Sequence, residues 1–199
     1  MPLDYKQEIE RKLIHLSSFW MVAAVYFLSE GWAIGFFSVA AAFVLVSEYA
    51  AYKHPKSLFA KGYNCIFARV LRDKEKKKFF RFSGAPYVLI AALLLVVFCP
   101  KIVTMFALSV LFISDSMAAL VGKSIGKHRL FGRKTWEGTT AFVLSGLVVA
   151  GVFYACCGLS IPLAVVGVLL GCLGDLSNET IHVDDNLSIP LLVALPFLI

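Results

Sequence analysis

The stretch ISDSMAALVGKSIGKHRLFGRKTWEGT, residues 113–139, decides how the rest of this chain is interpreted. It starts with an acid, Asp115, near the end of a long apolar run, and it closes with a second acid, Glu137, where apolar sequence resumes. Between them lie two glycines that are each followed by a lysine, Gly122 and Gly126, and five cations: Lys123, Lys127, Arg129, Arg133 and Lys134. Acids suit a metal ion, cations suit phosphates, and glycines permit close backbone approach. This central stretch therefore predicts a site that handles phosphate.

The overall composition is that of a membrane protein. The 199-residue chain is 59% hydrophobic and 16% charged, with a mean hydropathy of +0.80. A soluble domain is typically about 45–50% apolar and about 25% charged. The polar N-terminus does not resemble a cleaved signal peptide, so the first apolar run is interpreted as a span that stays. The five cysteines show no paired metal spacing, and we interpret them as small hydrophobic residues.

Seven apolar runs divide the chain, which we treat as a single domain over residues 1–199. They cover Leu13–Ser29, Trp32–Tyr49, Ala85–Cys99, Ile102–Val121, Thr139–Cys157, Ile161–Leu173 and Leu187–Ile199. A straight span needs about 20 residues, which the second, fourth and fifth runs supply. The third, sixth and seventh runs are short, and we expect them to tilt, to include flanking residues or to pack inside the bundle. We predict an all-α, polytopic helical membrane protein with about seven transmembrane helices.

The basic residues predict the orientation. Eighteen of the nineteen Lys and Arg residues lie in segments 1–12, 53–84 and the central stretch, with Lys101 as the exception. Seven spans place these three segments on one face, and the positive-inside rule makes that face cytoplasmic. We therefore expect an integral protein of the cell or inner membrane, or of an endoplasmic reticulum-type membrane, with its site on the cytoplasmic face. The charge of +6 then reflects topology, and no nucleic-acid partner is expected.

Segment 53–84 has a helical pattern of its own. Its apolar residues recur at helical spacing, while several cations lie off that face: Phe59, Tyr63, Ile66, Phe67, Val70 and Leu71 against Lys61, Arg69 and Arg72. This pattern predicts an amphipathic helix in the membrane interface, with the cations of 74–78 near anionic headgroups. A solvated loop that only sets the topology is the alternative.

Acidic residues at the ends of apolar runs are the candidates for metal binding, because ionisable groups at membrane depth cost energy and tend to be functional. Asp175 and Glu179 are four residues apart and share one face if their segment is helical. Asp184 and Asp185 follow closely. Two or three of these acids with Asp115 could hold Mg²⁺ together with substrate phosphates. The alternative is that they lie in solvent or pair with the cations of the central stretch.

Two further patterns are weaker. MAALVGKS in the central stretch resembles a P-loop, but its first position is Met117 instead of glycine and no soluble strand precedes it. What remains is the chemistry of glycines and cations near an anion. His15 follows Arg11 and Lys12 at the start of the first run, and a lone histidine there is more often interfacial than catalytic.

Three pieces of the chain together resemble a known family. They are Asp115-x-x-Ala118 with Gly122-x-x-x-Gly126-Lys127 and Lys134-x-x-Glu137-Gly138-Thr139, then Arg11-Lys12-x-x-His15, and Asp184-Asp185-Asn186-Leu187-Ser188-Ile189-Pro190. The chain resembles the CTP-dependent lipid kinases, a family that includes dolichol kinase, phytol kinase and a CTP-using diacylglycerol kinase and is related to phosphatidate cytidylyltransferase. The pieces extend over nearly the whole chain, from Arg11 to Pro190.

The resemblance implies that the central stretch binds CTP, that Asp115 and Gly122 are needed, and that Arg11 and Lys12 take part. We expect a kinase that transfers the γ-phosphate of CTP to a lipid alcohol, with Mg²⁺ or another divalent cation as cofactor. The expected roles are catalytic for Asp115, Glu137 and Asp184; nucleotide-binding for Arg11, Lys12, Gly122, Lys123, Gly126, Lys127, Arg129, Arg133, Lys134 and Asn186; and metal-binding for Asp115, Asp175, Glu179 and Asp185.

Other readings stay open from the sequence. One is a cytidylyltransferase that makes a CDP-lipid by attack at the α-phosphate. Another is a small transporter or scaffold, although the polar residues gather at one face instead of at the midplane. The alcohol, which could be a polyprenol, dolichol, a shorter isoprenoid or diacylglycerol, is not specified by the sequence, and a homo-oligomer is left open.

Overall fold

The structure is a computed structural model that describes residues 5–54, 82–132, 134–181 and 183–199. Its elements, in chain order, are α1 (Tyr5–Ser17), α2 (Trp20–Phe27), α3 (Glu30–Lys53), α5 (Gly84–Phe98), α6 (Lys101–Ser124), β1 (Arg129–Phe131), β2 (Lys134–Thr135), α7 (Trp136–Cys157), α8 (Ile161–Ile181), α9 (Asp185–Ala194) and the 3₁₀ turn η1 (Leu195–Phe197). The protein is mostly helical, as predicted. The exception is a two-stranded antiparallel hairpin, β1–β2, within the central stretch.

Among the described residues, three helices are long and apolar enough to cross a membrane. They are α3, α6 and α7, with 24, 24 and 22 residues. At about 1.5 Å per residue, 22 residues extend over about 33 Å, which exceeds a hydrocarbon core of about 30 Å. Shorter apolar helices cover Gly84–Phe98, Ile161–Ser177 and Asp185–Phe197. The length and composition of these helices are consistent with a membrane protein, and a total of seven spans stays a prediction.

The first apolar run differs from the prediction of one continuous span. The structure divides Leu13–Ser29 into α1, which ends at Ser17, and α2, which begins at Trp20. Two consecutive serines explain the break, because the hydroxyls of Ser17 and Ser18 both donate to the carbonyl of Ile14, at 2.6 and 3.4 Å. Such side chains compete with the helical hydrogen bonds of the backbone. The turn is closed by backbone hydrogen bonds between residues three apart, including the one from the Ser18 N–H to the His15 carbonyl at 3.1 Å.

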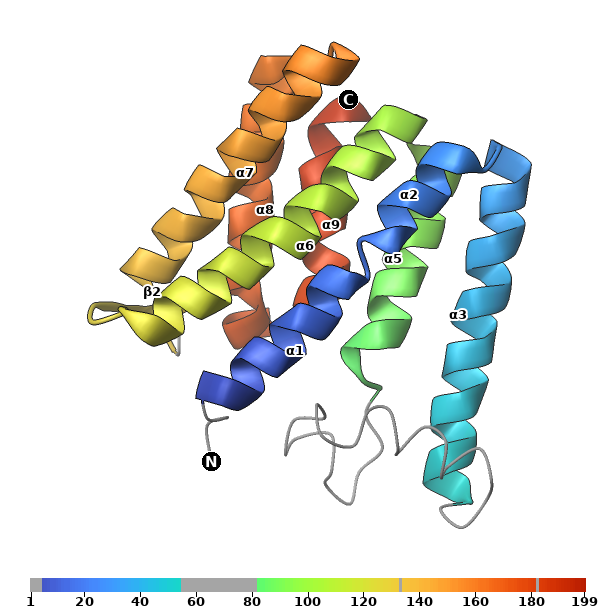
Figure 1. Ribbon diagram of the computed structural model, residues 1–199, viewed down its shortest axis with the longest axis horizontal. Helices are drawn as coiled ribbons and strands as arrows, with labels where there is room; N and C mark the ends of the chain where they lie inside the picture. The colour runs from blue at the N-terminus through green and yellow to red at the C-terminus, as the bar shows by residue number, and fades with distance from the viewer. Residues whose placement is uncertain (1–4, 55–81, 133, 182) are drawn as a thin grey trace.

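Helix α6 is the centre of the bundle. It packs against α1, α2, α5, α7, α8 and α9, and Figure 1 shows it crossing the middle of the molecule. Its Phe106, Leu108, Leu111 and Phe112 are fully buried. Helix α3 lies at the periphery and packs chiefly against α5. A polar residue on the inner part of α6 is therefore enclosed by its neighbours instead of facing lipid.

Glycines let α8 and α9 approach each other closely. A Cβ atom on Gly167 would lie 2.4 Å from the carbonyl oxygen of Val193, and one on Gly171 would lie 2.5 Å from the side chain of Val193. Small residues at helix contacts allow such approach in membrane proteins. At the end of this contact the Ser188 hydroxyl donates to the Gly174 carbonyl at 3.2 Å. The contact brings the residue after Gly174, Asp175, beside the start of α9.

One end of the bundle collects the polar helix termini. The start of α1, the end of α6, the hairpin and the start of α7 lie there, whereas the C-terminus of the chain lies at the other end (Figure 1). The segments that sequence reasoning placed on one face thus share an end of the molecule where they are described. The predicted amphipathic helix over 59–71 lies outside the described residues.

Candidate active site

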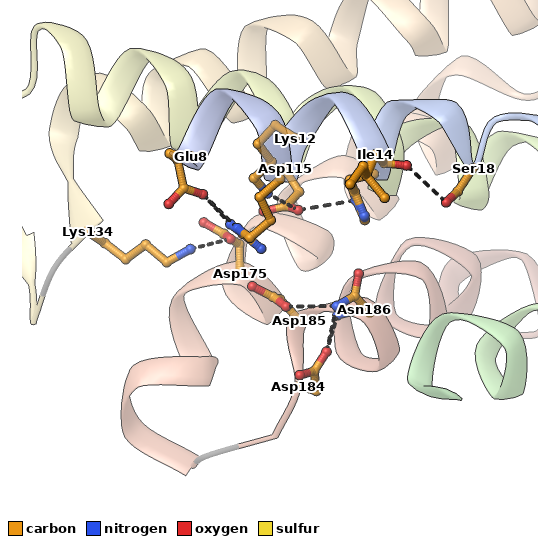
Figure 2. A network of polar contacts seen from close by, with 12 residues as sticks. Glu8, Lys12, Ile14, Ser18, Asp115, Lys134, Asp175, Asp184, Asp185 and Asn186 are labelled. Atoms are coloured by element: carbon orange, nitrogen blue, oxygen red, sulfur yellow. Dashed lines mark hydrogen bonds and ion pairs between the residues drawn. The ribbon is translucent and has the colours of Figure 1, made fainter. Parts of the chain in front are cut away.

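Three buried carboxylates from three helices meet at this end. Asp115 comes from α6, Asp175 from α8 and Asp185 from the first turn of α9, and one oxygen atom of each lies within 4.8 Å of the others. Figure 2 shows them facing a common centre. Like charges this close repel strongly in a site of low dielectric. This carboxylate cluster therefore needs positive charge or bound protons to be stable.

Two lysines supply that charge. Lys12 of α1 is fully buried, and its ammonium group donates to Asp115 Oδ2. Lys134 of β2 donates to Asp175 Oδ1, as Figure 2 shows. Burial alone would lower the pKa of Lys134, but the carboxylates of Asp175 and Asp115 outweigh it and hold this pKa above its ordinary value. The lysine therefore stays charged at neutral pH.

A second group of charged residues is centred on Glu8, one turn before Lys12 on α1. The Arg11 Nε atom donates to Glu8 Oε1 at 2.9 Å, and Lys123 Nζ lies 3.6 Å from Glu8 Oε2. Burial would raise the pKa of Glu8, but the Arg11 guanidinium and its neighbours lower it overall. Glu8 thus orders two predicted phosphate-binding cations. Sequence reasoning did not select it, although its spacing of three residues from Arg11 on one helix was the available signal.

The start of α9 is built around Asp184. Its Oδ1 atom caps the helix by accepting from the Asn186 N–H at 3.1 Å, and it also accepts from the Asn186 amide at 2.7 Å. The same amide lies 3.3 Å from Asp185 Oδ1. Gly84 leaves space for the side-chain amide of Asn186, because a Cβ atom at position 84 would lie 2.6 Å from the Asn186 Nδ2 atom. Asp184 and Asn186 are therefore held next to the carboxylate cluster.

Glu137 makes its described contacts with the loop before the hairpin. Its carboxylate accepts hydrogen bonds from the backbone N–H groups of Lys127 and His128 at 3.1 and 3.2 Å, and it lies 2.8 Å from His128 Nδ1. The side chains of Lys127 and Arg129 are exposed, and Arg133 is outside the described residues. Glu137 thus closes the loop that carries these cations, while its predicted catalytic role stays a prediction.

Gly122 and Gly126 pack closely around Thr135. A Cβ atom on Gly126 would lie 2.1 Å from the Gly122 carbonyl oxygen and 2.7 Å from the Thr135 hydroxyl. One on Gly122 would lie 3.0 Å from the same hydroxyl. Thr135 in turn accepts from the Gly138 N–H at 3.2 Å and caps α7. The contacts explain these glycines by packing between α6, the hairpin and α7, and their predicted phosphate contact stays a prediction.

The structure therefore gathers many of the predicted site residues. It unites Lys12, Lys134, Asp115, Asp175 and Asp185, with Asp184 and Asn186 next to them (Figure 2). Arg11 and Lys123 both pair with Glu8. The side chain of Glu179 lies outside the described part. His15, which sequence reasoning placed at the interface, lies against the cluster: its Nε2 atom is 3.3 Å from Asp115 Oδ2.

The donor set fits a divalent cation. Mg²⁺ prefers oxygen ligands and usually takes one or two carboxylates with substrate phosphates. Asp115, Asp175 and Asp185 offer three such oxygens at convergent positions. The buried lysines fit the same chemistry, because an ammonium group can neutralise a phosphate beside the metal. Fold and site thus define a helical membrane-type protein with a metal- and phosphate-compatible centre at one end of its bundle.

Comparisons with known proteins agree with this class. The chain is 31% identical to a phytol kinase of Synechocystis over 192 residues, which is 92% of this chain and 76% of the relative. It is 25% identical to an uncharacterised protein of Rickettsia prowazekii over 94% of this chain and 92% of that one. A third relative, an uncharacterised protein of Methanocaldococcus jannaschii, is 30% identical over 62% of this chain and 59% of its own length. No protein-family model and no solved structure matches.

The match to the phytol kinase is long enough to decide the family. It extends over nearly the whole of this chain and three quarters of the relative. The chain therefore belongs to the family of this phytol kinase, and at the level of that family it is a lipid kinase-like protein.

Proposed function

We propose that this protein is a CTP-dependent kinase that transfers the γ-phosphoryl group of CTP to the hydroxyl of a membrane lipid alcohol, giving a lipid monophosphate. The observation that carries the proposal is the carboxylate cluster with Lys12 and Lys134 against it. Family membership supports the kinase class, and the motifs in the sequence support CTP as donor. The site is proposed to face the cytoplasm, where a water-borne nucleotide is available.

The proposed reaction is a direct transfer. The hydroxyl oxygen of the lipid bonds to the γ-phosphorus, the bond from that phosphorus to the β,γ-bridging oxygen breaks, and CDP leaves. The proton of the hydroxyl passes to a carboxylate and then to water. Asp184 is the candidate for this carboxylate, because it adjoins the cluster without being one of its three members. Such transfers depend on positioning and charge neutralisation more than on covalent chemistry.

Asp115, Asp175 and Asp185 would hold Mg²⁺ or another divalent cation, with Glu179 as a further predicted ligand. When bound, the ion offsets the charge of the phosphate oxygens. Lys12 and Lys134 already lie against two of these carboxylates, so their ammonium groups are in place to contact phosphate oxygens in the same centre. Arg11 and Lys123, ordered by Glu8, would extend this positive charge outward.

The surroundings of the site favour a lipid as acceptor. Asp115, Asp175 and Asp185 come from apolar helices and meet at one end of the bundle. If this end lies at the membrane surface, as proposed, an alcohol in the bilayer would present its hydroxyl there. The relative is named for phytol, a long-chain alcohol. We therefore propose a long-chain alcohol of the isoprenoid kind as the first candidate, with diacylglycerol as the comparison.

The test uses purified protein in lipid vesicles with CTP labelled at either the γ- or the α-phosphate. The panel of acceptors is a short isoprenoid alcohol, phytol, a polyprenol, dolichol and diacylglycerol, each with Mg²⁺ or with EDTA. We expect γ-label on the lipid, none from α-labelled CTP, and loss of transfer with EDTA. Lipid that carries α-label with release of pyrophosphate would support the cytidylyltransferase alternative instead. ATP labelled at the γ-phosphate in the same assay decides the donor.

A further inference from the structure

We propose that the surface at the α1–α2 break binds the acceptor alcohol, with His15 holding its hydroxyl beside Asp115 and Phe19 and Trp20 contacting the start of its apolar chain. This inference rests on the proposed function and adds to it the site of the acceptor, which the motifs of the sequence do not assign.

The first observation is the environment of His15. Its side chain is largely buried, and its Nε2 atom lies 3.3 Å from Asp115 Oδ2. Within the described ranges this nitrogen has no hydrogen-bond partner. Its ring is fixed, because it packs edge-on against Phe112 with 5.2 Å between the ring centroids. A buried polar nitrogen without a partner is costly, so a fixed and unsatisfied one beside the carboxylate cluster points to a ligand.

A hydroxyl group is the ligand that this position suits. It can donate to one partner and accept from another. The imidazole Nε2 atom either donates or accepts according to its tautomer, and the adjacent Asp115 carboxylate accepts. An alcohol oxygen next to both atoms would satisfy His15 and would lie at the edge of the centre proposed to hold the phosphates. Lys12 approaches the same oxygen, Asp115 Oδ2, from α1.

The second observation is the apolar surface that begins at His15. Phe112, against which His15 packs, also contacts Phe19, with 6.3 Å between the two ring centroids. Phe19 is 40% exposed and Trp20 is 48% exposed. Both α1 and α2 pack against α6, so His15 and Phe19 stay beside the same central helix despite the break.

The order of these groups matches the chemistry of a long-chain alcohol. Its polar end would meet His15 and Asp115, and its chain would continue past Phe19 toward Trp20 and the bilayer. The nucleotide would reach the carboxylate cluster from the other side, where Arg11 and Lys123 pair with Glu8 in the first turn of α1. Bilayer lipid of any kind also contacts exposed aromatic rings. The matched phenylalanine variants and the competition with phospholipid distinguish such general contact from binding of the alcohol.

Kinetics with the full-length protein in vesicles test His15. The variant H15F keeps a ring to pack against Phe112 and removes the nitrogen, whereas H15Q keeps a polar group near the position of Nε2. We expect H15F to raise the KM for phytol about tenfold, with the KM for CTP unchanged, and H15Q to recover part of the loss, as a lost hydrogen bond to a buried group predicts. A fall in kcat with an unchanged KM for phytol would overturn the role in acceptor binding.

A matched pair of phenylalanines tests the apolar surface. F19A removes the ring next to Phe112, and F27A removes a ring that is 80% exposed at the far end of α2. We expect F19A to raise the KM for phytol more than the KM for a five-carbon isoprenoid alcohol, and F27A to change neither. Equal effects of the two variants would mean that only general lipid contact is involved.

Photolabelling tests the site without turnover. A long-chain alcohol that carries a diazirine next to its hydroxyl end is incubated with the unsubstituted protein and irradiated, and labelled peptides are mapped by mass spectrometry. We expect label on residues 13–20, reduced by excess phytol but not by a phospholipid. Label elsewhere, or label that phospholipid reduces equally, would overturn the inference. If no γ-label transfer occurs at all, the proposed function fails, while this mapping still reports on the alcohol site.

Discussion

The buried carboxylate cluster and the hairpin of the central stretch are built in opposite ways. The cluster takes single residues from three helices, with lysines from α1 and β2, and nearly all of them are enclosed. The hairpin and the loop before it form one continuous segment, in which the cations Lys127 and Arg129 are exposed, whereas Lys134 of β2 pairs with the cluster. The residues of the central motif are concentrated in the hairpin segment, whereas the buried charges proposed to bind metal and phosphate lie in the cluster.

This difference has energetic consequences. Exposed ion pairs contribute about 0–1 kcal/mol, and their members can be exchanged at little cost. Removing one partner of a buried pair costs about 3–5 kcal/mol, because the other charge remains without compensation. Substitutions in the cluster should therefore affect both folding and transfer, and substitutions in the hairpin should affect mainly nucleotide affinity.

The largest effect is expected for D115N in the cluster. It removes the carboxylate that contacts both Lys12 and His15, and we expect γ-label transfer to fall by at least about a hundredfold, the scale of losing one preorganised charge contact. The measurement is the initial rate of transfer from labelled CTP to lipid. E30Q, at an exposed acid in the first turn of α3, is the control and should retain full activity. Retained transfer in D115N would remove the cluster from the mechanism.

The second prediction compares two lysines, one from each region. K134M leaves Asp175 buried without its partner and should lower the free energy of unfolding by about 3–5 kcal/mol, whereas K127M should change it by less than about 1 kcal/mol. The measurement is denaturant unfolding in detergent, with γ-label transfer alongside. Equal losses in the two variants would contradict the division into buried and exposed regions.

The same pair has a defined pH dependence. Because the pKa of Lys134 is raised in the folded protein, the contribution of the lysine to stability is fully present below the ordinary lysine pKa of 10.5, as long as Asp175 is ionised. That stabilisation is lost only as the pH rises through the raised value. The difference in stability between K134M and the unsubstituted protein should thus stay constant from about pH 7 to pH 9.

The third prediction concerns the contact between α6 and the hairpin. G126A places a Cβ atom against the Gly122 carbonyl and Thr135, so it should destabilise the protein by about 1–3 kcal/mol and reduce transfer. G31A is the matched control, because a Cβ atom there meets nothing within 4 Å. Thermal unfolding in detergent measures both. A stable G126A that had lost only CTP affinity would instead favour the predicted phosphate contact of this glycine.

The smallest effect is expected for E137Q in the hairpin region. If Glu137 holds the loop through the Lys127 and His128 N–H groups, the variant raises the KM for CTP a few-fold and leaves kcat nearly unchanged. If Glu137 instead deprotonates the lipid hydroxyl, as the predicted catalytic role implies, the variant lowers kcat strongly. Steady-state kinetics at varied CTP separate the two roles, with H128Q as a control for the contact to the histidine ring.

Much of the fold could be predicted because apolar runs in a membrane protein have few alternatives to helices. The prediction of one continuous helix over Leu13–Ser29 was wrong at Ser17 and Ser18. There the two hydroxyls donate hydrogen bonds to the Ile14 carbonyl, and the helix is interrupted. Among the site residues, Asp115 could be selected because an acid in an apolar helix is conspicuous. Glu8 and His15 had weaker signals, a spacing of three residues from Arg11 and a place in one motif, because their importance depends on Lys123 and Asp115 being near them in space.

Composition and order along the chain are enough to predict a helical, apolar protein whose cations are confined to a few segments and whose motifs resemble those of lipid kinases. That Asp115, Asp175 and Asp185 share one centre with Lys12 and Lys134 becomes visible in the folded protein alone. The reason is that the glycine contacts between α8 and α9, and the packing of α1 on α6, bring residues together that no spacing in the sequence relates.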